Sequence, residues 1–390
     1  MTATDGRSAP WLTVGFRLFF LLGVADAVIA MATWVAVLRG AARLPLAGLP
    51  PTSWHAHELL FGFVQAIIAG FLLTAVRSWT GRPTLAGPGL VALAAPWVAA
   101  RGLWSLGSSP APAAIADLTF GLALLVVLAR PIVQARQARQ AGVLAKVALL
   151  QVAQLVFLAG ALGQVADGLR IGVYAALYLI IGLVLTIARR VFVFFVRSAL
   201  PDAPQLPERP WLDRAALAAF LVLFVLDVLA PWPAGARGAA ALLAALHAVR
   251  LRSWWAPGVA SRSLLWVLFV AYGWFVLGFA AYAAGPWLGL TPALVAHLWA
   301  AGGLGTVILG MVARVTLGHT GRDVRADRPG LAAVFAAGIA AALLRVAGPW
   351  LAPGASLAWW SAAGAAWVGA FGALLVWGAP MWLGRRADGG

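Results

Sequence analysis

About twelve apolar segments of membrane-crossing length follow one another along the chain, of which the eighth is short. A helix needs about 20 mainly apolar residues to cross roughly 30 Å of hydrocarbon, whereas a barrel strand needs only about ten. Such long segments therefore indicate helices, which satisfy their own backbone hydrogen bonds in lipid. We predict an all-α, polytopic membrane protein with one transmembrane domain over residues 1–390. The segments lie near 12–38, 54–76, 86–107, 112–130, 143–163, 171–196, 213–231, 237–250, 263–284, 291–314, 330–351 and 356–383.

The composition agrees with this fold class and narrows the chemistry. Hydrophobic residues make up 63% of the chain and charged residues only 10%, which is far from the balance of a soluble domain. There is no cysteine. Disulfides, thiolate metal sites and iron–sulfur clusters are therefore excluded.

Positive charges fall mainly on one side of the predicted membrane. When each of the 28 Lys and Arg residues is assigned to the nearer helix end, 22 fall at the N-terminus or after even-numbered segments, and 6 on the other side. Lysine and arginine accumulate on the cytoplasmic side, so both termini are predicted to be cytoplasmic. The net charge of +16 then reflects topology and anionic lipid, with the bilayer as partner and no nucleic acid. The six are Arg39, Arg43, Arg101, Arg170, Arg237 and Arg345.

The second and tenth segments share a residue pattern. A shift of 240 residues superposes two histidines, two pairs of glycines and a terminal Thr-Gly-Arg tripeptide. Chance is the alternative in a chain with 43 glycines. We interpret the pattern as an internal repeat that places one histidine at the same depth in each segment. The matched positions are His57 with His297, Gly62 with Gly302, Gly70 with Gly310, and Thr80-Gly81-Arg82 with Thr320-Gly321-Arg322.

This repeat predicts a cofactor site. Two neutral imidazoles on separate helices suit axial ligation of a haem iron. We therefore predict His57 and His297 as the ligands, with Gly62 and Gly302 leaving room for the ring. His55 is the alternative ligand, or binds a separate metal where the helix begins. For each histidine, a hydrogen-bonded structural role is the competing interpretation.

Two further positions complete the candidate set. His319 is a weak metal candidate because its 22-residue separation from His297 corresponds to ~33 Å of helix. Glu58 is the candidate catalytic residue, since an ionisable group inside a span is functional by default. Hydration at the headgroup level, or pairing with an arginine, is the alternative for Glu58. The spans also contain Asp26, Asp117 and Asp227, which the sequence alone does not connect.

Three stretches resemble the NnrS family. They are Trp54-His55-Ala56-His57-Glu58-Leu59-Leu60-Phe61-Gly62-Phe63, the run from Gly310 to Arg322, and Gly15-Phe16-Arg17-Leu18-Phe19-Phe20. The resemblance implies a bacterial inner-membrane protein with twelve spans, which binds haem, of b type, and copper. It also implies a role in the response to nitric oxide and nitrosative stress, with a small gaseous or redox ligand and an electron donor that it does not identify.

Two departures from the family pattern bear on a second metal site. The run from Ala188 to Arg197 lacks the proline and threonine usual there, and Phe269 stands where the family often has histidine. The layout is also similar to subunit I of haem–copper oxidases, whose low-spin haem is held by histidines on spans two and ten. Their copper-centre histidines on spans six and seven have no counterpart here.

We therefore predict protection against nitric oxide through haem binding or redox chemistry, and leave open whether the protein is an enzyme. Two alternatives remain from other classes of protein. One is a transporter of a small metabolite or metal complex, because internal repeats are common in transporters. The other is a nitric oxide reductase, which would need a second metal beside the haem.

Overall fold

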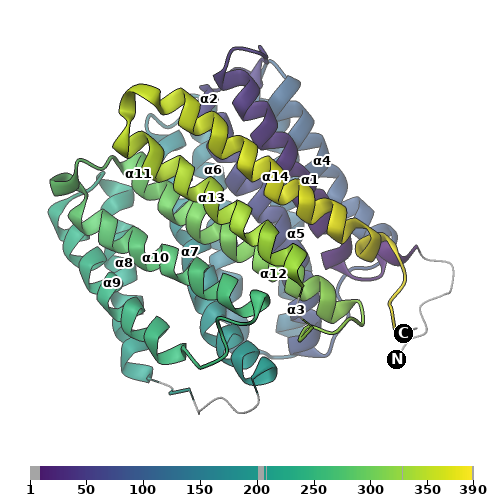
Figure 1. Ribbon diagram of the computed structural model, residues 1–390. Coiled ribbons are helices and arrows are strands. Elements are labelled where there is room, and N and C mark those ends of the chain that lie inside the picture. Colours follow the sequence, from purple (N-terminus) through teal and green to yellow (C-terminus); the bar gives the residue numbers. More distant parts are fainter. Residues whose placement is uncertain (1–8, 201–205, 208, 327, 389–390) are drawn as a thin grey trace. The chain divides into compact units, whose positions relative to one another are not determined.

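The computed structural model describes residues 9–200, 206–207, 209–326 and 328–388, which form helices and connecting loops without a β-strand (Figure 1). This confirms the predicted all-α polytopic fold. The α-helices are α1 Gly15–Leu38, α2 Pro51–His57, α3 Gln65–Thr80, α4 Pro88–Leu106, α5 Pro110–Gln134, α6 Ala141–Ala161, α7 Gly168–Ala199, α8 Pro210–Leu229, α9 Ala234–Trp254, α10 Ser263–Leu288, α11 Pro292–His297, α12 Thr306–His319, α13 Pro329–Leu351 and α14 Ser356–Leu383.

Ten helical spans within these described residues are long and apolar enough to cross a membrane. Each coincides with one of the twelve predicted segments, and the two predicted segments left over form α8 and α9. These two helices fall short because of charge: α8 carries Asp213, Arg214 and Asp227, and α9 carries three arginines. Part of that charge is compensated, because Asp213 pairs with Arg250 of α9 at 2.6 Å.

Proline sets the start of many helices. Each of α2, α4, α5, α8, α11 and α13 begins with proline in its first turn. The fixed φ of proline suits this position, where the missing N–H would have no partner in the helix. The two helices of the sequence repeat also end alike, because Gly81 and Gly321 follow them with φ of 66° and 73°. Only glycine adopts this left-handed cap without steric cost.

The chain divides into two compact units, which are described separately. The first contains Met1–Ile180, Val315–Arg322 and Phe371–Gly390, and the second contains Ile181–Arg314 and Asp323–Ala370. In the first unit, α1 packs along α3, and α5 contacts α3, α4 and α6. In the second, α9 contacts both α8 and α10, and Figure 1 draws these three helices in teal and green.

Small residues bring α1 and α3 close together. A methyl group added at Gly70 would lie 3.0 Å from Phe19 Cβ, and one added at Gly23 would lie 3.2 Å from Ala66 Cβ. Such a seam lets helices approach when lipid provides no hydrophobic drive between them. The sequence pattern Gly62, Ala66, Gly70 therefore marks a helix contact, and its partner is α1.

The first unit also ties the beginning of α1 to the end of α14. The buried Arg17 guanidinium donates to the carbonyls of Met381 at 3.1 Å and Trp382 at 3.2 Å, and also to that of Gly384. The last carbonyls of a helix have no partner within it. Arg17 thus caps the C-terminal end of α14, where the helix dipole also favours a positive charge.

Candidate functional site

The second and tenth spans share a backbone feature as well as residues. In each, an α-helix gives way to a π-helical segment directly after the histidine: Glu58–Val64 after His57, and Leu298–Gly305 after His297. α3 and α12 then continue the two spans. A π segment is rare and is often found at functional sites, because it shifts the side chains around the helix axis. The 240-residue repeat thus coincides with two matching interruptions of helix geometry.

His57 lies in the first unit, fully buried, between two carboxylates. Its Nδ1 is 2.9 Å from Glu58 Oε1, and its Nε2 is 3.1 Å from Asp117 Oδ2. The Nδ1 contact is an aligned hydrogen bond, whereas the Nε2 contact has only ion-pair distance. Since ionised carboxylates only accept hydrogen bonds, these surroundings favour protons on both ring nitrogens.

Three aromatic rings enclose the imidazole of His57. The ring centroids of Trp104, Phe157 and Phe61 lie 4.5, 4.8 and 5.3 Å from it. They exclude water from the two carboxylate contacts. Electrostatic interactions at His57 are therefore much stronger than they would be at the protein surface.

Arg101 of α4 joins the two carboxylates. Its Nη1 is 2.5 Å from Glu58 Oε1, and its Nη2 donates to Asp117 Oδ1. Trp104, one turn further along α4, donates from Nε1 to Asp117 Oδ2 at 2.5 Å. Charge-assisted bonds of this kind are the strong ones in proteins. They hold both acids in fixed positions beside His57.

Asp26 of α1 is the fifth charged group at this place. A methyl group at Gly62 would lie 2.9 Å from Asp26 Oδ2 and 2.7 Å from Arg101 Nη1. Asp26 Oδ2 is buried and has no hydrogen-bond partner among the described residues. Because Gly62 has no side chain, Arg101 and Asp26 can approach the backbone of the second span closely.

We call these five residues the charged cluster: Asp26, His57, Glu58, Arg101 and Asp117. It draws on α1, α4, α5 and the α2–π junction, which contribute three acids against Arg101 and His57. Even with His57 protonated, the acids are in excess by one. Sequence analysis found four of these residues but not their convergence, and it placed Arg101 only as a topological charge. The position of Arg101 inside a predicted span, where charged residues are often functional, is the sequence signal that could have revealed its role.

The other predicted site residues have different surroundings. His55 stacks on the Trp34 ring with centroids 4.5 Å apart. His319 is exposed, lies in the first unit, and has its ring 5.7 Å from that of Phe16. His297 belongs to the second unit, and its Nδ1 is 2.7 Å from the Ala293 carbonyl oxygen. Because His57 and His297 fall in different units, their pairing stays a prediction.

The two repeat glycines make room for side chains of this chain. The space at Gly62 is taken by Arg101 and Asp26, and a methyl group at Gly302 would lie 2.6 Å from the indole of Trp274. Although Glu58 and Asp117 both contact His57, no group of three or more His, Asp or Glu side chains among the described residues has the arrangement of a metal site. The positions of haem and copper stay predictions.

The family model described as NnrS protein matches residues 10–386, nearly the whole chain. The chain belongs to the NnrS family. This confirms the resemblance found in the sequence and supports a part in the nitric oxide response. No curated protein matches the chain. In this NnrS-family chain, the charged cluster and both π segments lie within the matched residues.

Proposed function

We propose that this NnrS-family protein binds haem in a bacterial inner membrane and thereby helps to protect the cell from nitric oxide. The observation that carries the haem proposal is the hydrogen bond of His297. A backbone carbonyl can only accept, so this contact places a proton on Nδ1 of His297, and a neutral ring would then carry its lone pair on Nε2. Metal-bound histidines commonly have this tautomer, fixed by such a contact. The donor chemistry at His297 therefore fits an axial iron ligand.

His57 does not fit a ligand role in the state described. Both ring nitrogens face carboxylates, and aromatic side chains fill the space around the ring. It could become a ligand only if Nε2 parted from Asp117. We therefore assign His297 as the leading ligand, keep His57 as the second candidate, and expect His55 to contribute least.

Bound haem would supply an iron that takes up nitric oxide or exchanges electrons. The protein's own contribution is the charged cluster, which keeps exchangeable protons in an apolar environment. Glu58 and Asp117 orient the His57 ring, and Arg101 holds both carboxylates in place. Redox chemistry of nitrogen oxides consumes protons, so a buried proton store beside span two suits this function.

Purified protein should test the ligand assignment through haem content and the reduced absorption spectrum. We expect His297→Ala to remove most of the haem, or to shift its spectrum. His55→Ala and His319→Ala should keep the wild-type spectrum. The matched control is His247→Ala, because His247 is buried and bonded to Tyr272 at 2.6 Å but has no part in the sequence repeat. A wild-type spectrum and haem content in folded His297→Ala would reject the assignment.

The orientation of the chain is part of the same proposal. Of the six positive charges on the sparse side, Arg101 belongs to the charged cluster and is no loop charge, which sharpens the asymmetry. Both termini should be cytoplasmic. A reporter active only in the cytoplasm, fused after Gly390, should be active, and a reporter active only in the periplasm should be silent there. The reverse pattern would invert the topology.

A transporter is the second candidate function, and the two π segments favour it. Interrupted helices at matching positions in a repeat are typical of transporter binding sites, as are charged groups inside the membrane. The substrate would be a small metabolite or metal complex. Haem-free protein in proteoliposomes would then show substrate-dependent flux that is lost in Arg101 variants. One haem per purified protein molecule, together with no substrate flux in proteoliposomes, would favour the first proposal.

A further inference from the structure

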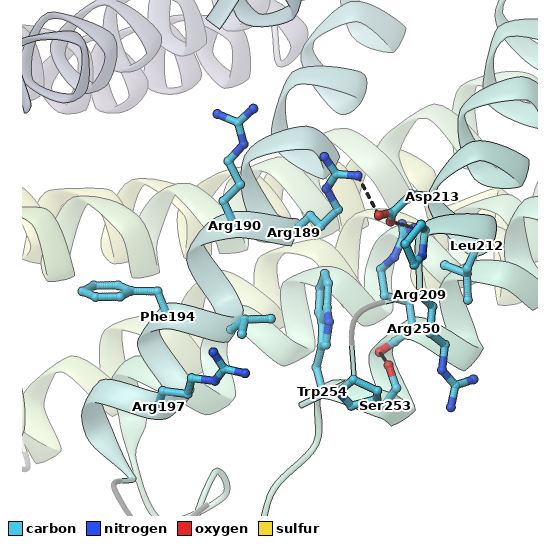
Figure 2. Close-up of a pocket in the computed structure, with 13 residues that line it drawn as sticks. Arg189, Arg190, Phe194, Arg197, Arg209, Leu212, Asp213, Arg250, Ser253 and Trp254 are labelled. Atoms are coloured by element: carbon cyan, nitrogen blue, oxygen red, sulfur yellow. Dashed lines mark hydrogen bonds and ion pairs between the residues drawn. The ribbon is translucent and has the colours of Figure 1, made fainter. Parts of the chain in front are cut away.

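A cavity of about 580 Å³ opens in the second unit, where α7 and α9 approach their C-terminal ends and α8 begins (Figure 2). Arginines from two helices and one loop dominate its lining, and the only acid among the described lining residues is Asp213. The arginines are Arg189, Arg190, Arg197, Arg209 and Arg250. The loop acids Asp202 and Glu208 lie outside the described residues.

Asp213 holds two of these arginines in place. Its Oδ2 is 2.6 Å from Arg189 Nη1, the contact drawn in Figure 2, and its Oδ1 is 2.6 Å from Arg250 Nη2. Arg250 is buried, and its Nη1 donates to Tyr272 at 3.4 Å. The cavity wall is therefore fixed before any ligand binds, which lowers the entropic cost of binding.

The remaining arginines leave strong positive charge for a ligand. Arg197 and Arg209 are exposed, and no described residue forms an ion pair with either guanidinium. Five guanidinium groups against one carboxylate give the described lining a formal charge of +4. Like charges brought together in this way repel one another, and an anion bound among them relieves that repulsion.

The start of α8 adds to the positive field. Pro210, Leu212 and Asp213 of its first turn line the cavity, and no side chain caps the helix at Arg209. The first N–H groups of a helix lack partners within it and carry the positive end of the helix dipole. Phosphate groups bind such ends readily, and arginine forks match their oxygens.

We propose that this cavity binds a phosphate group through Arg197, Arg209 and the α8 N-terminus. The bound group would be either the headgroup phosphate of an anionic phospholipid or free inorganic phosphate. Apolar lining residues, including Val193, Phe194 and Trp254, would suit the glycerol and upper acyl carbons of a lipid. Exposed Phe194 borders the cavity on α7, so a lipid could enter along that helix.

The test uses full-length purified protein and two probes. Phosphatidylglycerol binding is counted by native mass spectrometry against phosphatidylcholine, and inorganic phosphate binding is measured by calorimetry on delipidated protein. The double variant Arg197→Gln/Arg209→Gln should weaken binding of the preferred probe about tenfold or more, because several charge-assisted bonds are lost. The single variant Arg197→Gln should show a smaller loss.

The matched control is Arg214→Gln/Arg252→Gln. It removes two exposed arginines from the same ends of α8 and α9, neither of which lines the cavity, and so leaves the same net charge as the test variant. It should change affinity less than about twofold, as expected for charges outside the site. Selective phosphatidylglycerol binding identifies a lipid, and tight inorganic phosphate binding identifies a free phosphate. Equal losses in both double variants, or no binding of either probe to wild-type protein, would overturn the proposal.

Discussion

Arg101→Leu should destabilise the protein by about 3–5 kcal/mol or prevent its folding, because it removes one partner from buried ion pairs and leaves the acids uncompensated. Arg101 contacts Glu58 at 2.5 Å and also binds Asp117. Its side chain is only 11% exposed, so water cannot replace these bonds. Three carboxylates would then share the cluster with His57 alone.

Folded yield and thermal unfolding in detergent measure this effect. Arg43→Leu is the matched control, because Arg43 lies on the same predicted side of the membrane but is exposed and forms no ion pair among the described residues. Arg101→Lys should recover part of the stability, although lysine lacks the fork that reaches two carboxylates.

A double variant tests the cause of the Arg101 effect. Arg101→Leu/Glu58→Gln should be more stable than Arg101→Leu alone, because it removes one of the negative charges that Arg101 no longer compensates. If Arg101→Leu unfolds like the wild-type protein, or if the double variant is the less stable one, electrostatic compensation does not hold the cluster together.

The helical spans could be predicted from the sequence to within about five residues at each end. Apolar length decides a membrane span, and the chain offers no other way to satisfy its backbone in lipid. Even the short eighth segment formed a helix, α9. Only the apolar character of α8 and α9 was overestimated, because both helices carry several charged residues. Some of these charges have partners on other helices, such as Asp213 with Arg189, and the sequence does not reveal such pairs.

The charged cluster could be predicted only in part. His57 and Glu58 are neighbours in the chain, so their importance could be inferred locally. Asp26, Arg101 and Asp117 come from three other helices, and their meeting depends on which helix faces which. Helix contacts in lipid follow the fine shape of small-residue seams. A single sequence therefore does not show which helices pack against one another.

The π segments could not be predicted at all. A π turn differs from an α turn by one residue per hydrogen bond, and no local residue pattern separates the two here. The sequence repeat marked both places, through His57 with His297 and Gly62 with Gly302, and the two π segments begin directly after the histidines. The matching residues 240 positions apart thus indicated that the two spans share a feature. Only the backbone geometry shows that this feature is a π segment.

Gly62→Ala should destabilise the protein by about 1–3 kcal/mol, as overpacking does at a filled site. The new methyl group would lie 2.7 Å from Arg101 Nη1 and 2.9 Å from Asp26 Oδ2. Arg101 cannot swing aside freely, because Glu58 and Asp117 hold its guanidinium. Gly102→Ala is the control, since nothing lies within 4 Å of its Cβ position. It should be neutral, or stabilise α4 by up to about 1 kcal/mol through higher helix propensity.

Two explanations of Gly62 give different results for the same variant. If the glycine makes room for Arg101 and Asp26, the unfolding temperature of the haem-free Gly62→Ala protein should be lower than that of the wild type. The double variant Gly62→Ala/Asp26→Ala should then lose less stability than the sum of the losses in the two single variants. If the glycine instead leaves room for a haem ring, the haem-free protein should unfold as the wild type does, and only haem content should fall. Measuring both quantities on one preparation decides between the charged cluster and the cofactor as the reason that position 62 carries no side chain.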